Sequence, residues 1–240
     1  MGISETLLLA RHKFIDLVLG LAPRVAAFDC DGTLWSGDAG EGFFDWEIRA
    51  GFVSAEIGRT MRGRYAEYKL GQISEDDMCS EMVTMHKGMS EAVMIEAAEE
   101  FMNGAFAGKV FDEMLELVER LRERGCDIWA VSSSNEWVIR AGVKPFGILE
   151  NRILAAKAET ENGVVGDRIL RSPSGPGKPL ALRGVLDGQR LDAAFGNSRW
   201  DTEMLAMAEH PFAINPTPDF FISARRRGWA IYFPDGAGRP

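Results

Sequence analysis

A short apolar run that ends in two aspartates constrains the fold of this chain more than any other feature. The run from Arg24 to Asp29 follows a proline and predicts a buried strand. Asp31-Gly32-Thr33 then predicts a tight turn. Similar runs predict strands at Cys126 to Val131 and Leu191 to Phe195, and segments of helical character separate them. Buried strands that alternate with helices predict an α/β fold with a parallel sheet covered on both faces.

The segment after the first predicted strand has a different character. From about Ser36 to Gly108, acidic and apolar residues recur at helical spacing. Ser74 and Ser90 each precede acidic residues, which is typical of helix starts. We therefore predict an all-helical cap domain over residues 37–107, inserted into a Rossmann-like doubly wound core of residues 1–36 and 108–240. Residues 1–22 should form an amphipathic helix that packs on this core.

The second half of the chain should complete the core. Arg152 to Leu170 contains two strand-like runs around Asn162-Gly163, which predicts a β-hairpin. A loop rich in proline, glycine and serine is predicted from Ser172 to Pro179, and it contains Lys178. The remaining predicted strands are Phe212 to Ile214 and Trp229 to Phe233, with a helix between them.

Two carboxylates at the end of the first predicted strand suit phosphoryl transfer. Ligands bind at the carboxyl ends of the strands in parallel sheets. Asp29 could hold a hard cation and attack phosphorus, whereas Asp31 could protonate the leaving alcohol and later deprotonate water. Gly32 would let the backbone turn closely around a phosphate. The alternative interpretation is an ordinary Asp-Gly turn.

Four polar residues further along the chain fall at corresponding positions. Ser132 and Asn197 follow the second and third predicted strands, Asp201 lies near the next helix start, and Lys178 lies in the proline-rich loop. Each has an ordinary interpretation as a helix cap, a turn residue or a solvated lysine. Because each follows its own strand or loop in this order, we expect all four to converge on Asp29.

These motifs resemble those of the haloacid dehalogenase-like superfamily. The segment Asp29-Cys30-Asp31-Gly32-Thr33 is similar to the first motif, which supplies the nucleophile and the acid/base. Ser132 resembles the second motif, a phosphate hydrogen-bond donor. Lys178 resembles the third, and Asn197 through Asp201 the fourth, which supplies metal ligands. The helical insertion is similar to the cap of the phosphoserine-phosphatase-like branch.

The resemblance implies a Mg²⁺-dependent phosphatase that hydrolyses a small phosphomonoester through an aspartyl phosphate on Asp29. Asp31 distinguishes the phosphoryl-transferring members from the dehalogenases, which lack that acid/base. Asn197 departs from the common pattern, which has an aspartate that binds Mg²⁺, so we expect weaker metal binding or a more direct role for Asp201. The implied catalytic residues are Asp29, Asp31, Ser132 and Lys178, and the implied metal ligands are Asp29, Asp31, Asn197 and Asp201. The alternatives are a phosphotransferase or phosphomutase on the same scaffold and a non-catalytic member of the superfamily.

Residues close to the first motif could contact the substrate. An acidic side chain there could bind an ammonium group, and aromatic rings could pack on it by cation–π contact. The open alternative is that the aromatic side chains only seal the cap against the core. Phosphoserine-like and phosphocholine-like monoesters are both candidates. The predicted substrate-binding residues are Gly32, Thr33, Ser133, Asp38, Glu41 and Phe44.

Composition limits the other partners. The 27 basic and 36 acidic residues give a formal net charge of −9, which argues against nucleic acid or an anionic membrane because both need a basic face. The apolar segment near the N-terminus is too short to span a membrane. The three cysteines, widely spaced and without a CxxC pair, are typical of a reducing compartment. A cytoplasmic location is therefore expected, and the oligomeric state is left open.

Overall fold

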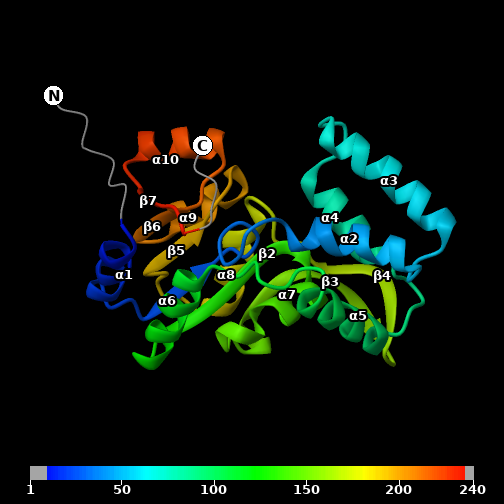
Figure 1. The fold of residues 1–240 in the computed structure, drawn as a ribbon, viewed down its shortest axis with the longest axis horizontal. Helices are drawn as coiled ribbons and strands as arrows, with labels where there is room; N and C mark the ends of the chain where they lie inside the picture. Colours follow the sequence, from blue (N-terminus) through cyan, green and yellow to red (C-terminus); the bar gives the residue numbers. More distant parts are fainter. Residues whose placement is uncertain (1–9, 236–240) are drawn as a thin grey trace.

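A seven-stranded sheet runs through the computed structural model, which describes residues 10–235 (Figure 1). The strand order is β4-β3-β2-β1-β5-β6-β7. All neighbouring pairs are parallel except β3 and β4, which are antiparallel. This confirms the α/β class and the parallel core. The strands are β1 Val25–Phe28, β2 Asp127–Asn135, β3 Ile153–Glu161, β4 Val164–Arg171, β5 Ala193–Gly196, β6 His210–Ile214 and β7 Ala230–Tyr232.

Helices cover both faces of the sheet, as the strand-helix alternation predicts. The ten α-helices of residues 10–235 are α1 Arg11–Gly20, α2 Ala39–Ala50, α3 Ala55–Lys69, α4 Glu75–Thr84, α5 Glu91–Asn103, α6 Asp112–Glu123, α7 Glu136–Val143, α8 Gly177–Leu186, α9 Thr202–Met207 and α10 Pro218–Arg227. Three short 3₁₀ helices are η1 Lys144–Phe146, η2 Glu150–Arg152 and η3 Arg199–Asp201. Among the residues that the structure describes, no helix is long and apolar enough to cross a membrane.

Strand β1 lies in the middle of the sheet and is buried on both sides. Ala26 and Phe28 pack in one apolar cluster with residues of α1, α6 and α7. Val25 and Ala27 pack in a second cluster with residues of α8, α9 and α10. Successive strand residues point to opposite faces, so a continuously apolar strand is what a sheet covered on both faces requires.

Helices α2 to α5 all lie in the predicted insertion. Figure 1 shows α3 and α4 at the end of the sheet that carries the β3–β4 hairpin, away from α1 and α10. The connection between α4 and α5 pairs with the edge strand β4, because Val165 N donates to Met89 O at 2.9 Å and Gly88 N donates to Val165 O at 2.8 Å. These bonds satisfy backbone groups that an edge strand would otherwise expose.

The hairpin follows the sequence prediction closely. Asn162 and Gly163 both have positive φ, at 51° and 77°, which the two-residue hairpin turn between right-twisted strands requires. Asparagine tolerates this conformation better than most residues, and glycine has no Cβ to oppose it.

Two boundaries differ from the sequence prediction. The predicted loop from Ser172 to Pro179 ends early, because α8 begins at Gly177 and places Lys178 in its first turn. Strand β2 continues past Val131 to Asn135, with an irregularity in its pairing to β3 over that stretch. The serines were expected just after the strand, and they lie within its last residues instead. Of the predicted N-terminal helix, α1 is described, whereas the pattern residues before Ala10 lie outside the described residues.

Candidate active site

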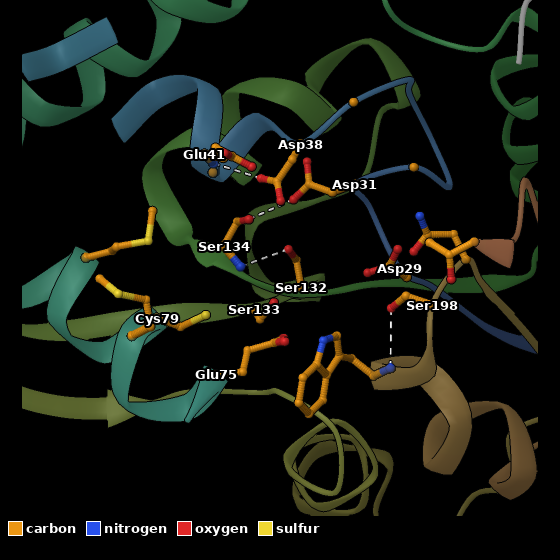
Figure 2. Close-up of a pocket in the computed structure, with 18 of the residues that line it drawn as sticks. Asp29, Asp31, Asp38, Glu41, Glu75, Cys79, Ser132, Ser133, Ser134 and Ser198 are labelled. Atoms are coloured by element: carbon orange, nitrogen blue, oxygen red, sulfur yellow. Dashed lines mark hydrogen bonds between the residues drawn. The ribbon is translucent and has the colours of Figure 1, made fainter. Parts of the chain in front are cut away.

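A pocket of about 660 Å³ opens at the carboxyl edge of the sheet (Figure 2). Nine of the predicted site residues line it: Asp29, Asp31, Gly32, Asp38, Glu41, Ser132, Ser133, Lys178 and Asn197. The other three, Thr33, Phe44 and Asp201, do not line the pocket. Thr33 and Asp201 form hydrogen bonds with residues that do, whereas Phe44 packs in an apolar cluster with Met61 and Met78, of which Met78 lines the pocket. The fold thus gathers side chains that are up to 172 positions apart in the chain.

Asp29 lies at the base of the pocket, directly after β1. Its Oδ1 accepts a hydrogen bond from Lys178 Nζ at 2.7 Å, and its Oδ2 accepts one from Thr33 Oγ1 at 2.8 Å. Burial, reinforced by the nearby carboxylate of Asp201, raises the pKa of Asp29 to about 7, and Lys178 and Thr33 oppose that rise. The carboxylate is therefore held in one orientation, with free lone pairs on both oxygens.

Lys178 joins two acidic residues from different parts of the sheet edge. Its ammonium donates to Asp29 as described and to Asp201 Oδ1 at 2.5 Å, and the lysine side chain is 2% exposed. Burial alone would lower the pKa of Lys178, but the carboxylates of Asp201 and Asp29 outweigh burial and raise it. The lysine is thus a fixed positive charge in the lining of the pocket.

Asp201 is itself held by the turn that follows β5. Its Oδ2 accepts hydrogen bonds from the backbone N of Asn197 and of Ser198, both at 3.0 Å. The backbone thereby orients one carboxylate oxygen and leaves Oδ1 for Lys178. An aspartate at the start of a helix commonly forms such a turn, and here the same geometry directs its second oxygen toward Asp29.

Asp31 has three hydrogen-bond donors of its own. Trp35 Nε1 donates to Oδ1 at 2.8 Å, the backbone N of Ala39 donates to the same oxygen at 2.5 Å, and Ser134 Oγ donates to Oδ2 at 2.7 Å. Burial and the neighbouring carboxylate of Asp38 raise the pKa of Asp31 to about 7, against the effect of these donors. Such a pKa lies where a group can release and take up a proton near neutral pH.

Ser132 and Ser134 have different partners. Ser132 is 1% exposed, and its Oγ accepts a hydrogen bond from Ser134 N at 3.1 Å. Figure 2 shows Ser134 turned toward Asp31, from the end of the same strand. Sequence reasoning missed the contact between Ser134 and Asp31. The run of three serines was the only sequence signal for this contact, and it does not indicate which of the three hydroxyl groups bonds to Asp31.

Gly32 is a position where the fold requires glycine. Its φ is +74°, and a Cβ built there would lie 1.9 Å from Nδ2 of Asn197. The carbonyl oxygen of Gly32 accepts a hydrogen bond from Asn215 Nδ2 at 3.3 Å. The turn after β1 is therefore packed directly against the turn after β5, with no room for a side chain between them.

The donor set suits a hard cation but is short of carboxylates. Asp29 and Asp201 share Lys178, and the Asn197 side chain lies beside Gly32 in the same turn region. Carboxylate and amide oxygens are ligands that Mg²⁺ accepts. Within residues 10–235, no group of three or more acidic, histidine or cysteine side chains could hold a metal ion. The asparagine at position 197 is one reason, since an aspartate there would add a third carboxylate.

Sequence reasoning also missed part of the pocket wall. Helices α3 and α4 contribute to it, although no motif marked their residues. The additional lining residues include Tyr65, Tyr68, Lys69, Glu75, Met78, Cys79 and Met82, together with Trp200 from η3. In the sequence these side chains are indistinguishable from an ordinary helix surface or core.

The fold and the pocket define an α/β protein with a polar site at the carboxyl edge of a parallel sheet. The sequence matches the family model described as haloacid dehalogenase-like hydrolase over residues 26–206. The chain therefore belongs to the haloacid dehalogenase-like hydrolases. A search of curated proteins found no match.

Several solved structures share this fold. A protein of unknown function from Bordetella pertussis Tohama I is similar with a TM-score of 0.78 and 22% identity, over 88% of this chain and 98% of that chain. A phospho-aspartyl intermediate analogue of phosphoserine phosphatase gives a TM-score of 0.58 at 14% identity, over 88% and 93% of the two chains. A substrate-bound phosphoserine phosphatase complex gives a TM-score of 0.58 at 15% identity, over 88% of this chain and 92% of that chain. At these identities the likeness concerns the fold.

Proposed function

We propose that this protein is a Mg²⁺-dependent phosphatase that hydrolyses a small phosphomonoester through an aspartyl phosphate on Asp29. One observation carries the proposal: Lys178 joins Asp29 and Asp201 at the base of a pocket whose wall also presents Asp31. A nucleophile, a separate acid/base and a fixed cation are the groups that hydrolysis through a covalent phosphoenzyme needs. The phosphoserine phosphatases among the structural neighbours support the same reaction class.

The first half-reaction uses both aspartates of the first motif. A carboxylate oxygen of Asp29 forms a bond to phosphorus while the bond from phosphorus to the alcohol oxygen breaks. Asp31, in its protonated form, gives its proton to that leaving oxygen. Ser132 and Lys178 supply a hydroxyl and an ammonium to the phosphoryl oxygens, where negative charge is concentrated.

The second half-reaction releases phosphate. Asp31 is now ionised and takes a proton from a water molecule, whose oxygen attacks phosphorus and displaces the Asp29 carboxylate. Ser134, Trp35 and the Ala39 amide hold Asp31 in place through both steps. Hydrogen bonds to the charged form of Asp31 favour that form, whereas burial favours the neutral form. The balance between them lets one side chain serve first as acid and then as base.

A bound Mg²⁺ would supply positive charge to the phosphoryl oxygens and orient them for in-line attack. The residues that would hold it are Asp29, the backbone carbonyl of Asp31, Asn197 and Asp201. Because the Asn197 side chain is neutral, we infer weaker binding than a site with a third carboxylate would give.

We also propose that residues 37–107 act as a cap that determines which leaving group is accepted. Three helices of this segment support the idea, because each brings side chains to the pocket wall. The lining side chains from these helices include Asp38 and Glu41 at the start of α2, Tyr65 and Tyr68 in α3, and Glu75 and Cys79 in α4.

The proposed function is tested by phosphate release from p-nitrophenyl phosphate, with Mg²⁺ and with EDTA. Wild-type protein should release free phosphate only when Mg²⁺ is present. Asp29→Asn should fold normally and lose turnover, because a neutral amide is a poor nucleophile. Turnover by Asp29→Asn would refute the aspartyl phosphate, and transfer to an added alcohol without free phosphate would indicate a phosphotransferase instead.

A further inference from the structure

One side of the pocket is formed by helices of the proposed cap. In Figure 2, Glu75 and Cys79 lie on one side, and Asp29 lies on the other. If the phosphoryl group sits beside Asp29, the alcohol that carries it must extend toward Glu75 and its neighbours. The chemistry of this wall therefore decides which alcohols fit.

Glu75 is a buried carboxyl group that forms no ion pair with any of the described residues. The residue is 7% exposed, and its side chain points into the pocket. Oε1 accepts a hydrogen bond from Ser174 Oγ at 2.8 Å, and Oε2 accepts one from Tyr68 OH at 3.3 Å. Both donors are neutral, and no ion pair within 4.0 Å reaches Glu75 from residues 10–235. Burial raises the pKa of Glu75, and the hydrogen bonds from Ser174, Tyr68 and Ser133 together with the more distant charge of Lys178 oppose that rise without cancelling it.

Two aromatic rings of the same pocket wall, those of Tyr65 and Tyr68, already accommodate an ammonium group. Lys69 Nζ lies 4.9 Å from the centroid of the Tyr65 ring and 5.9 Å from that of Tyr68. Such distances are those of cation–π contacts. The lysine side chain is 54% exposed and pairs with Glu41 at 3.3 Å, so it occupies the outer part of the wall and forms no ion pair with Glu75.

The pocket has no spare cation for a substrate carboxylate. Among the described residues that line it, the acidic side chains are Asp29, Asp31, Asp38, Glu41 and Glu75, and the basic ones are Lys69 and Lys178. Lys178 is committed to Asp29 and Asp201, and Lys69 to Glu41. A carboxylate on the alcohol would lie near Glu75 with like charges in a desolvated site, which is costly.

Resting on the proposed phosphatase function, we propose that the pocket selects phosphomonoesters whose leaving alcohol carries an ammonium group and no carboxylate. Glu75 binds that ammonium, and Tyr65 and Tyr68 pack on its carbon atoms. Phosphorylated amino alcohols are therefore the substrate class, with either a primary or a quaternary ammonium. An amino acid phosphate such as phosphoserine fits this wall less well, although phosphoserine phosphatases share the fold.

The test compares kcat/KM for phosphoethanolamine, phosphocholine, ethyl phosphate and phosphoserine in Mg²⁺. Ethyl phosphate matches phosphoethanolamine in size but lacks the ammonium. The better of the two ammonium substrates should exceed both other compounds by about tenfold or more, because a positive charge is attracted to the Glu75 carboxylate in a site largely shielded from water. A preference for phosphoethanolamine would indicate that hydrogen bonding to the ammonium dominates, and a preference for phosphocholine would indicate that contact with the aromatic rings dominates.

Glu75→Gln then tests the residue itself. It keeps the size and can still accept from Ser174, so the preference for the ammonium substrate over ethyl phosphate should fall toward one. Asp76→Asn is the matched control, since it removes the same charge one residue along α4 from an exposed position; this variant should keep the preference. If Glu75→Gln does not fold, Tyr68→Phe removes one donor to Glu75 and should reduce the preference in part.

The outcomes separate this inference from the proposed function. Hydrolysis of p-nitrophenyl phosphate together with equal or better use of ethyl phosphate or phosphoserine would overturn the substrate class and leave the phosphatase intact. A preference that survives Glu75→Gln unchanged would overturn the role of Glu75. Absence of hydrolysis with every phosphomonoester would instead count against the phosphatase itself.

Discussion

Ser134 Oγ donates a hydrogen bond to Asp31 Oδ2 at 2.7 Å, across 103 positions of the sequence. The bond links the end of β2 to the turn after β1. It is possible because these strands are parallel neighbours, with Phe28 paired to Ala130. The hydroxyl favours the ionised form of Asp31, so it influences the group to which we assign both proton transfers.

Ser134→Ala should therefore slow turnover and alter its pH dependence. Without this donor the pKa of Asp31 rises above its present value of about 7. If protonated Asp31 is needed to expel the alcohol, the alkaline limb of the kcat profile should move to higher pH. The measurement is kcat from pH 5 to 9 with an alkyl phosphate such as ethyl phosphate, whose leaving alcohol needs the proton. A lower kcat with an unmoved alkaline limb would assign the serine a structural role only.

Lys178→Met should destabilise the fold, because it leaves Asp29 and Asp201 buried without their shared counter-charge. Removal of one partner from a buried ion pair typically costs about 3–5 kcal/mol, and protonation of a carboxyl group should limit the loss at low pH. Urea denaturation without metal gives the free energy of unfolding. Lys87→Met is the control, since its pair with Asp167 is exposed on both sides and should contribute less than about 1 kcal/mol. Equal losses of unfolding free energy in the two variants would contradict the role of Lys178 as the counter-charge that Asp29 and Asp201 share.

Asn197→Asp should strengthen Mg²⁺ binding and weaken the metal-free fold. The third carboxylate adds a charged oxygen ligand, and we expect the dissociation constant for Mg²⁺ to fall by about tenfold, or ~1.4 kcal/mol. Without metal, the same charge repels Asp29 and Asp201. Calorimetric titration with Mg²⁺ and thermal unfolding with EDTA measure the two effects. Asn162→Asp, in the hairpin turn, adds the same charge elsewhere and should change neither quantity appreciably. Unaltered Mg²⁺ affinity in Asn197→Asp would exclude this side chain as a ligand.

Gly32→Ala and Gly63→Ala should change stability in opposite directions. At Gly32 the positive φ and the contact with Asn197 make any Cβ unfavourable, so we expect a loss of more than about 1 kcal/mol and reduced turnover. Gly63 lies inside α3 with no atom within 4 Å of a built Cβ, so alanine should stabilise the helix by about 0.5–1 kcal/mol. The urea concentration at the midpoint of unfolding, measured for each variant and for the wild type, gives both changes in stability. A neutral Gly32→Ala variant would show that the two turns can separate at little cost.

Much of the fold is local enough to be predicted from the sequence. The apolar run before Asp29 can be buried only inside a sheet covered on both faces, and β1 is such a strand. Asn162-Gly163 predicts its hairpin because both residues tolerate positive φ. The boundary at Lys178 was predicted less well: Pro176, Gly177 and Pro179 are typical of a loop, yet proline is also tolerated in the first turn of a helix.

The sequence by itself determined the class of fold and the polar residues that follow each strand, because strand burial and turn chemistry depend on near neighbours. Only the tertiary structure decided which of those residues meet. It places Lys178 between Asp29 and Asp201, selects Ser134 rather than Ser133 as the partner of Asp31, and brings Glu75 to the pocket wall. Contacts of this kind depend on strand order and helix packing, which no short stretch of sequence specifies.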